Sequence, residues 1–220
     1  MRSASLLAAA VAATMQLTIA ADPASPFSVR DAGPPPGTLA PAVRKALDPM
    51  GIEVASDGSP MMTFWPRLEP PAADRGAPPP ATALGRDRVR LGELGRGSLA
   101  GVIFVQGAWA DARGRALTPG IYTARYAIQP QLKDHVDVSP WRDFLLLIPA
   151  GATDTPAALT EADAIARSRA ASGAGHPLVL GLRSPPAGAA TRTLVATDEG
   201  SWMIIAGESD HAIGVVLKGP

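Results

Sequence analysis

Three histidines, His135, His176 and His211, are the side chains of this sequence best suited to bind a metal ion. Imidazole nitrogens together with a carboxylate can hold zinc or copper. No His-x-His or His-x3-His spacing links the three, so a zinc or copper site requires that the fold bring His135 and His176 together. The alternative is that each histidine is an ordinary hydrogen-bonded or surface residue and that the protein has no cofactor.

A carboxylate at the edge of an apolar segment is the second feature that could take part in binding or catalysis. Asp143 directly precedes the apolar run 144–148. A carboxylate that enters a buried strand is costly unless it is paired. Asp143 could pair with Arg125 on a neighbouring strand, or accept a hydrogen bond from His135 or His176. Such a network is either structural or part of a pocket for a charged ligand.

Tryptophans in loops beside strands could complete such a pocket, because an exposed indole ring stacks on sugars and other flat groups. Trp141 and Trp109 are the best placed, and the alternative is that both pack in the core. The predicted ligand-binding residues are Arg125, His135, Trp141, Asp143 and His176.

Two common catalytic signatures are missing from the sequence. No Gly-x-Ser-x-Gly segment is present, so a serine hydrolase of that type is not indicated. The glycine-rich run 95–101 leads into a strand-like segment, whereas a phosphate-binding loop opens a helix. Its glycines fit turns and bulges better. The sequence identifies no catalytic residue and favours a protein that is not an enzyme.

Three segments occur in a distinctive order: Pro-Gly-x-Tyr-Thr, Pro-x4-His-x3-Ser-Pro-x-Arg-Asp-Phe, and Ala-Ser-Gly-x-x-His-Pro. This combination resembles a family of uncharacterised exported bacterial proteins over much of the mature chain. The resemblance implies export and groups His135, Asp143 and His176 in one cluster, and it implies no activity. The matching positions of the second and third segments are Pro130, His135, Ser139, Pro140, Arg142, Asp143, Phe144, Ala171, Ser172, Gly173, His176 and Pro177.

The composition restricts the class of protein. The 220 residues include no cysteine, and 20 basic residues balance 20 acidic ones. Disulfides, cysteine-based zinc sites and iron–sulfur clusters are therefore excluded. A chain with zero net charge lacks the electrostatic footprint of a nucleic-acid-binding protein. Its hydrophobic share of 46% predicts a soluble globular domain rather than a disordered chain.

The first 20 residues have the layout of a secretory signal peptide. Arg2 is followed by an apolar stretch over residues 6–13 and by small residues up to Ala20 and Ala21. The apolar stretch is too short to span a bilayer. We therefore expect cleavage after Ala20 or Ala21, a periplasmic or secreted location through the Sec route, and no membrane span in the mature chain.

Proline and glycine divide the rest of the chain. Residues 21–41 are predicted to be a flexible Pro-rich tail, and residues 66–87 a long Pro/Ala-rich surface loop. Residues 41–50 could form one short helix. The clearest helix is Glu161–Ala171, with Thr160 as N-cap and a stop at Gly173.

Short apolar or alternating segments account for most of the remaining chain and predict strands. They cover residues 52–55, 61–65, 89–91, 99–105, 121–128, 144–148, 178–182, 193–196, 202–206 and 212–217. Many short strands with one short surface helix predict a single domain, residues 42–220. We expect an antiparallel β-sandwich of the jelly-roll or immunoglobulin-like type.

Together these features predict an exported, non-enzymatic envelope protein that binds a small ligand or an envelope partner. One alternative is a zinc or copper protein, or a metal-dependent enzyme, that uses His135 and His176. The other alternative is a purely structural accessory domain. A ligand site would need a concave pocket with convergent polar groups.

Overall fold

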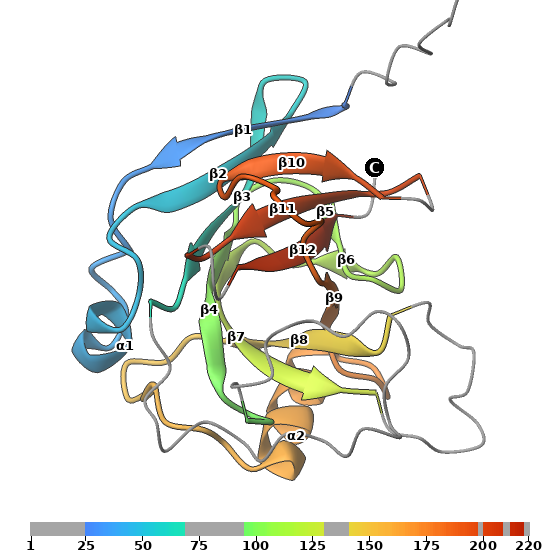
Figure 1. Ribbon diagram of the computed structural model, residues 1–220. Helices are drawn as coiled ribbons and strands as arrows, with labels where there is room; N and C mark the ends of the chain where they lie inside the picture. The colour runs from blue at the N-terminus through green and yellow to red at the C-terminus, as the bar shows by residue number, and fades with distance from the viewer. Residues whose placement is uncertain (1–24, 69–94, 130–140, 198–199, 209–211, 218–220) are drawn as a thin grey trace, which may run out of the picture.

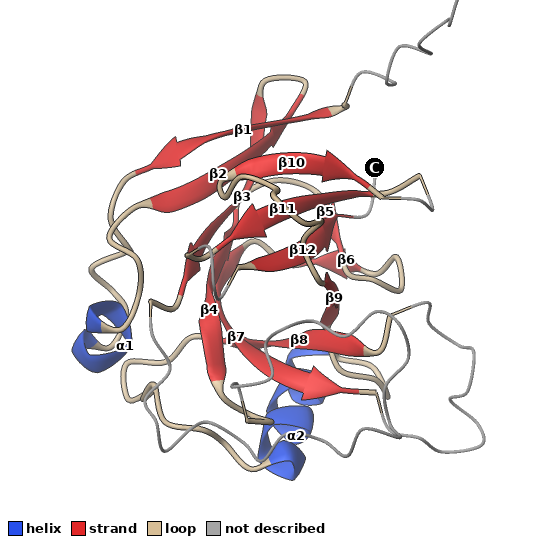
Figure 2. Ribbon diagram, viewed as in Figure 1, coloured by secondary structure: helices blue, strands red, loops and turns tan. Residues whose placement is uncertain are grey.

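The computed structural model describes residues 25–68, 95–129, 141–197, 200–208 and 212–217. These residues form one ten-stranded antiparallel sheet, a small two-stranded hairpin and two helices (Figure 1, Figure 2). The sheet consists of β1 (Phe27–Ala32), β2 (Gly51–Ser56), β3 (Ser59–Pro66), β4 (Leu99–Val105), β7 (Gly120–Ile128), β8 (Asp143–Pro149), β9 (Val179–Arg183), β10 (Thr193–Ala196), β11 (Trp202–Ala206) and β12 (Ile213–Leu217). The other elements are β5 (Trp109–Ala110), β6 (Ala116–Leu117), α1 (Pro41–Lys45) and α2 (Glu161–Ser172).

The sheet curls on itself until it is nearly closed into a barrel. Its strand order is β1-β2-β3-β4-β7-β8-β9-β12-β11-β10, with every hydrogen-bonded neighbour antiparallel. The last strand, β10, comes to lie beside the first, β1 (Figure 1). The predicted mainly antiparallel β class is confirmed. The division into two facing sheets, as in a sandwich, is not found, because all ten strands belong to one continuous ladder.

One arginine joins the two edges of the curled sheet. Arg192, the residue before β10, donates from Nε to Asp31 Oδ1 of β1 at 2.7 Å. Its Nη1 donates to the Met50 carbonyl at 3.1 Å and its Nη2 to the Gly51 carbonyl at the start of β2. Arg192 has a φ of +61°, a conformation that is rare for a residue with a side chain. The hydrogen bonds of the Arg192 guanidinium thus hold the start of β10 against β1 and the start of β2, where the two edges of the sheet meet.

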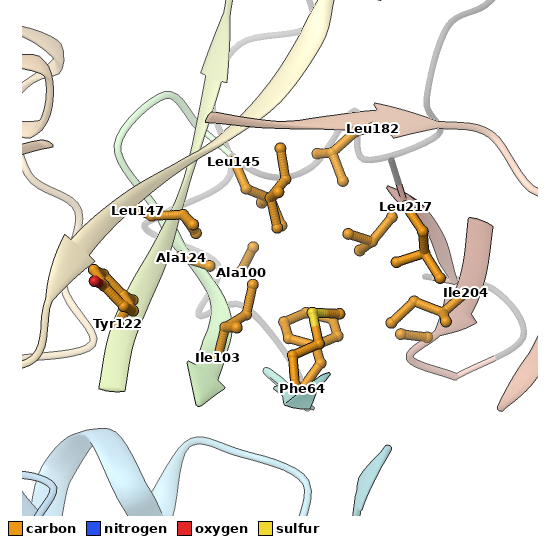
Figure 3. Packing of buried hydrophobic residues seen from close by; sticks show 14 of the residues in the cluster. Phe64, Ala100, Ile103, Tyr122, Ala124, Leu145, Leu147, Leu182, Ile204 and Leu217 are labelled. Carbon is orange, nitrogen blue, oxygen red and sulfur yellow. The ribbon is translucent and has the colours of Figure 1, made fainter. Parts of the chain in front are cut away.

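The interior of the barrel is apolar and is built by simple alternation along the strands. On β7, Tyr122, Ala124 and Tyr126 face inward, and on β8 Leu145 and Leu147 do so. Figure 3 shows side chains of this interior cluster pointing toward one another from several strands. The largest hydrophobic cluster of the described residues therefore lies inside the barrel.

Two smaller clusters cover the outside of the sheet. Val43 of α1 is fully buried among Trp65, Leu99 and Val102 on the outer face of β3 and β4. Ala164 of α2 packs with the outer residues of β8 and β9, such as Leu146 and Val179. This double covering explains why the run 144–148 is apolar on both faces, as expected for a central strand.

Local sequence signals account for the turn between β2 and β3 and for both ends of α2. Asp57 and Gly58 have φ values of +48° and +75°, which suits the two-residue turn between β2 and β3. The Thr160 side chain accepts a hydrogen bond from the Asp163 amide at 3.1 Å and so caps α2. Gly173 ends that helix in the left-handed region, with a φ of +60°.

The hairpin β5–β6 covers one end of the barrel. It connects the end of β4 to the start of β7, and its Trp109 and Leu117 belong to the interior cluster. The Trp109 ring lies 6.2 Å from the ring of Phe27 on β1, measured between centroids. Buried Asp111 accepts from Arg115 at 3.0 Å, and Arg115 Nη1 donates to the His176 carbonyl before β9. The hairpin therefore contacts β1 through Trp109 and the segment before β9 through Arg115.

The N-terminal part of the domain differs from its prediction. Part of the segment 21–41, predicted to be a flexible tail, forms β1, which pairs with β2 from Phe27↔Ser56 to Ala32↔Gly51. Phe27, Leu39 and Ala40 are buried. Proline does not prevent this, because β1 is an edge strand and its own residues include none. The predicted signal peptide, the predicted strand 89–91 and most of the predicted loop 66–87 lie outside the described residues.

Candidate functional site

Arg125 and Asp143 do not meet, although their strands are neighbours. In the β7–β8 ladder Arg125 pairs with Leu146 and Asp143 with Ile128, so the two side chains lie on opposite faces of the sheet. Arg125 faces outward and is only 2% exposed. Its guanidinium donates to the carbonyls of Thr155 and Ala157 at 2.7 and 2.6 Å. These hydrogen bonds hold the loop before α2 against the barrel.

The other predicted ligand-binding residues are dispersed. Trp141 packs on the outer face of β9, where a Cβ added to Gly181 would come within 2.7 Å of its ring. His176 is exposed, and its carbonyl accepts from Ser172 Oγ at 2.7 Å. His135 and His211 lie outside the described residues. Within the part of the chain that is described, no three His, Asp or Glu side chains are grouped as metal ligands.

Asp143 is the one predicted site residue that faces the barrel interior. It is 3% exposed, and its ladder partners Ile128 and Leu182 both belong to the interior cluster. The Tyr126 hydroxyl donates to Asp143 Oδ1 at 2.6 Å. This distance is typical of a strong hydrogen bond to a carboxylate. Tyr126 and Asp143 therefore form a buried polar pair at one end of an apolar interior.

The sequence could have indicated this partner. Alternation along residues 121–128 places Tyr126 on one face with Tyr122, Ala124 and Ile128, and all four belong to the interior cluster. Pairing the C-terminal end of β7 with the N-terminal end of β8 brings that face beside Asp143. The sequence does not give the register of the two strands, and without it the charged Arg125 was the more obvious partner.

The surroundings keep the Tyr126 hydroxyl protonated. Burial raises the pKa of Tyr126 far above its usual value, and the hydrogen bond to Asp143 raises it further. The positive charges of Arg142 and Arg96 oppose this and are outweighed. Burial also raises the pKa of Tyr122. Tyr126 therefore keeps its proton at neutral pH and donates it to the hydrogen bond with Asp143.

This pair leads to a prediction for alkaline pH. The chain has only two tyrosines, Tyr122 and Tyr126. We expect less phenolate absorbance from the folded protein than from the unfolded chain near pH 10, where tyrosine ordinarily ionises, because both pKa values are raised by burial. The unfolded chain releases these protons first, so stability is full below about pH 10 and falls as the pH rises further, by up to about 1.4 kcal/mol per unit for each tyrosine.

The measurement is a spectrophotometric titration of the two tyrosines, followed in parallel by circular dichroism. Phenolate should appear together with unfolding in the native protein. Tyr126→Phe should leave a single, smaller absorbance change. A reversible tyrosine titration near pH 10 with the circular dichroism unchanged would contradict the burial of both hydroxyls.

Comparison with protein-family models, with curated proteins and with solved structures finds no match for this chain. The described helices include none that is both long and apolar enough to cross a bilayer.

Proposed function

We propose that this chain is an exported, non-enzymatic envelope protein that holds a small, mainly apolar ligand inside its barrel. The observation that carries the proposal is the inner wall. It is apolar across the described strands, and the buried Tyr126–Asp143 pair lies at one end of it. Ligand sites in β-barrels combine an apolar lining with few polar groups in this way.

The number of strands supports a wide interior. Barrel diameter grows about linearly with strand number, and about eight strands enclose just enough space for side chains or one small ligand. The present sheet has ten strands. Its inner face carries small side chains at Ala100 and Ala124 of the adjacent strands β4 and β7, and at Ala206 of β11.

Export and membership of the exported family are part of the same proposal. Their support is the signal-like segment 1–20 and the three matching sequence segments. A protein that binds a small apolar compound outside the cytoplasm would act as a carrier or a sensor in the cell envelope. The zinc or copper hypothesis has no comparable support, because His176 is exposed and Asp143 faces the barrel interior.

The test uses the mature protein, a solvent-sensitive naphthylamine dye and the variant Ala124→Leu. Ala124 is fully buried in the middle of β7 and faces inward. We expect saturable dye binding to the unsubstituted protein. A larger side chain in an interior with room should leave the melting temperature unchanged or raised, and should weaken dye binding about tenfold or more.

Ala166→Leu is the matched control, since the same side chain is added on the exposed face of α2. It should change neither the melting temperature nor dye binding. If Ala124→Leu instead destabilises the protein by about 1–3 kcal/mol, as overpacking of a filled core does, the interior has no room and the proposal fails. Absence of any saturable dye binding to the unsubstituted protein has the same consequence.

A further inference from the structure

We propose that the ligand presents a neutral hydrogen-bond acceptor, the carbonyl oxygen of a ketone or an ester, to the indole N–H of Trp109 in the β5–β6 hairpin. It rests on the proposed interior site and adds the chemistry of the ligand's polar end. It follows from one buried donor for which the described residues supply no acceptor.

The Trp109 side chain is part of the inner wall at the hairpin end of the barrel. Trp109 is 4% exposed, and both it and its hairpin partner Leu117 belong to the interior cluster. Its Nε1 is buried and makes no hydrogen bond within the part of the chain that the structure describes. The Phe27 ring, 6.2 Å away between centroids, offers an aromatic contact but no oxygen acceptor. A buried indole N–H usually has a partner, so this one requires an explanation.

Neighbouring buried polar side chains at this end have their partners. Asp111 is fully buried and accepts from the Arg115 guanidinium and from the amides of Arg113 and Arg115. The Tyr122 hydroxyl donates to the Thr118 carbonyl at 2.7 Å. Poor packing of the hairpin therefore does not explain the unpaired indole.

A second buried tryptophan shows how the fold pairs an indole outside the barrel. Trp65 is likewise 4% exposed, and its Nε1 donates to the Gly33 carbonyl at 2.9 Å. Trp65 belongs to the cluster on the outer face of β3 and β4. Of these two equally buried tryptophans, the one on the outside has its acceptor, and the one in the interior cluster, Trp109, has none among the described residues.

The chemistry of the donor selects the group that the ligand presents. An indole N–H donates and does not accept, so its partner must carry an acceptor atom, which a protonated amine lacks. A carboxylate would exchange its hydration for a single neutral donor, and burial of a charge on these terms is costly. A hydroxyl would leave its own O–H in need of an acceptor in the same apolar surroundings. A carbonyl oxygen accepts the hydrogen bond without either cost.

The ladder of strands gives the direction of the bound molecule. β7 begins at the hairpin end, where Tyr122 reaches Thr118 beside β6, and Ala124 is the next inward residue along this strand. With its carbonyl at Trp109, the ligand therefore extends its apolar part past Ala124 toward the middle of the barrel.

The binding experiment uses two matched compounds as competitors of the naphthylamine dye. They are methyl nonyl ketone and the alkene in which a methylene group replaces its carbonyl oxygen, so the two differ only in the acceptor atom. Trp109→Phe keeps an aromatic ring and removes the N–H. It should weaken binding of the ketone about tenfold and leave binding of the alkene within about twofold. Trp65→Phe is the matched control, since it removes an equally buried indole outside the barrel, and it should change neither affinity.

Nuclear magnetic resonance of the isotope-labelled protein observes the donor itself. The chain has four tryptophans, and the indole signal that is missing from Trp109→Phe belongs to Trp109. We expect the ketone to move this proton signal downfield, as formation of a hydrogen bond does, and the alkene not to do so. Should Trp109→Phe not fold, the unsubstituted protein decides alone, because a single indole signal should then respond to the ketone and not to the alkene.

The outcomes separate the carbonyl contact from the interior site. Failure of the ketone to displace the dye, or an unchanged ratio of the two affinities in Trp109→Phe, overturns the carbonyl contact and leaves the interior site standing. The same holds if no indole signal moves downfield, or if the Trp109 proton keeps a nuclear Overhauser effect to an ordered water when the ketone is bound. Absence of dye binding to the unsubstituted protein rejects the interior site itself.

Discussion

Gly97→Ala is expected to reduce the free energy of unfolding by about 4 kcal/mol or more, the largest effect of any single methyl group in the described chain. Gly97 has a φ of +81°, where a side chain is strained. A Cβ on Gly97 would lie 1.9 Å from the Leu159 carbonyl oxygen. Backbone cannot move aside here, because the Gly97 amide donates to Tyr126 at 2.8 Å and its carbonyl accepts from Leu159.

Gly173→Ala separates the two causes. Gly173 has a φ of +60° but nothing within 4 Å of an added Cβ, so only the conformational cost of about 1 kcal/mol applies. Urea denaturation of both variants measures the difference. Equal losses at the two positions would show that the loop carrying Leu159 yields to the methyl group, and that Gly97 is needed only for its backbone conformation.

Gly97 belongs to a glycine-rich run, and the structure confirms the kind of role that the sequence predicts for this run. The run 95–101 was expected to serve turns and bulges rather than a phosphate. Gly97 sits before β4, and the β4–β7 register shifts between Leu99 and Gly101. A Cβ at Gly101 would come within 2.5 Å of the Trp65 carbonyl. The tight contacts that require these glycines come from distant parts of the chain, so the sequence alone cannot name them.

Strands, turns and the long helix could be predicted because their causes are local. Alternation, the Asp57-Gly58 turn and the Thr160 cap each involve residues close in sequence. Closure of the sheet has no such local cause. Arg192 reaches Asp31 from 161 positions away, and a polar arginine in a Gly/Ala/Pro-rich segment gives no sign of this role. A sandwich and a barrel can therefore share one list of strands.

The candidate site shows the same division between local and distant causes. Asp143 was selected correctly as a carboxylate entering a buried strand, and it is buried with a hydrogen-bond partner. Of the partners considered for Asp143, Arg125 is wrong, because the strand register places Tyr126 and not Arg125 on its face, and His135 lies outside the described residues. The remaining predicted residues, Trp141 and His176, lie elsewhere on the domain, since proximity in sequence to Asp143 or to a strand does not determine which face a side chain takes.

Arg125→Ala is expected to destabilise the protein by about 3–5 kcal/mol, because it creates a cavity and removes the hydrogen bonds that hold the loop before α2. Arg125 is among the largest fully buried side chains, and its guanidinium serves Thr155 and Ala157. Arg125→Lys should lose less, since a single ammonium keeps the charge but cannot donate in the same fork.

The control for Arg125 is Arg44→Ala, which removes an exposed arginine that also donates to a backbone carbonyl, that of Gly37, at 3.1 Å. Exposed positions of this kind change stability by no more than about 0.5 kcal/mol. Dye binding distinguishes a structural role of Arg125 from the ligand-binding role that the sequence suggested. Because Arg125 faces outward, Arg125→Lys should lower the urea midpoint and leave the affinity for the dye unchanged. A loss of dye affinity without a loss of stability would instead place the ligand on the outer face of β7, beside the loop 150–159, and would move the binding site out of the barrel.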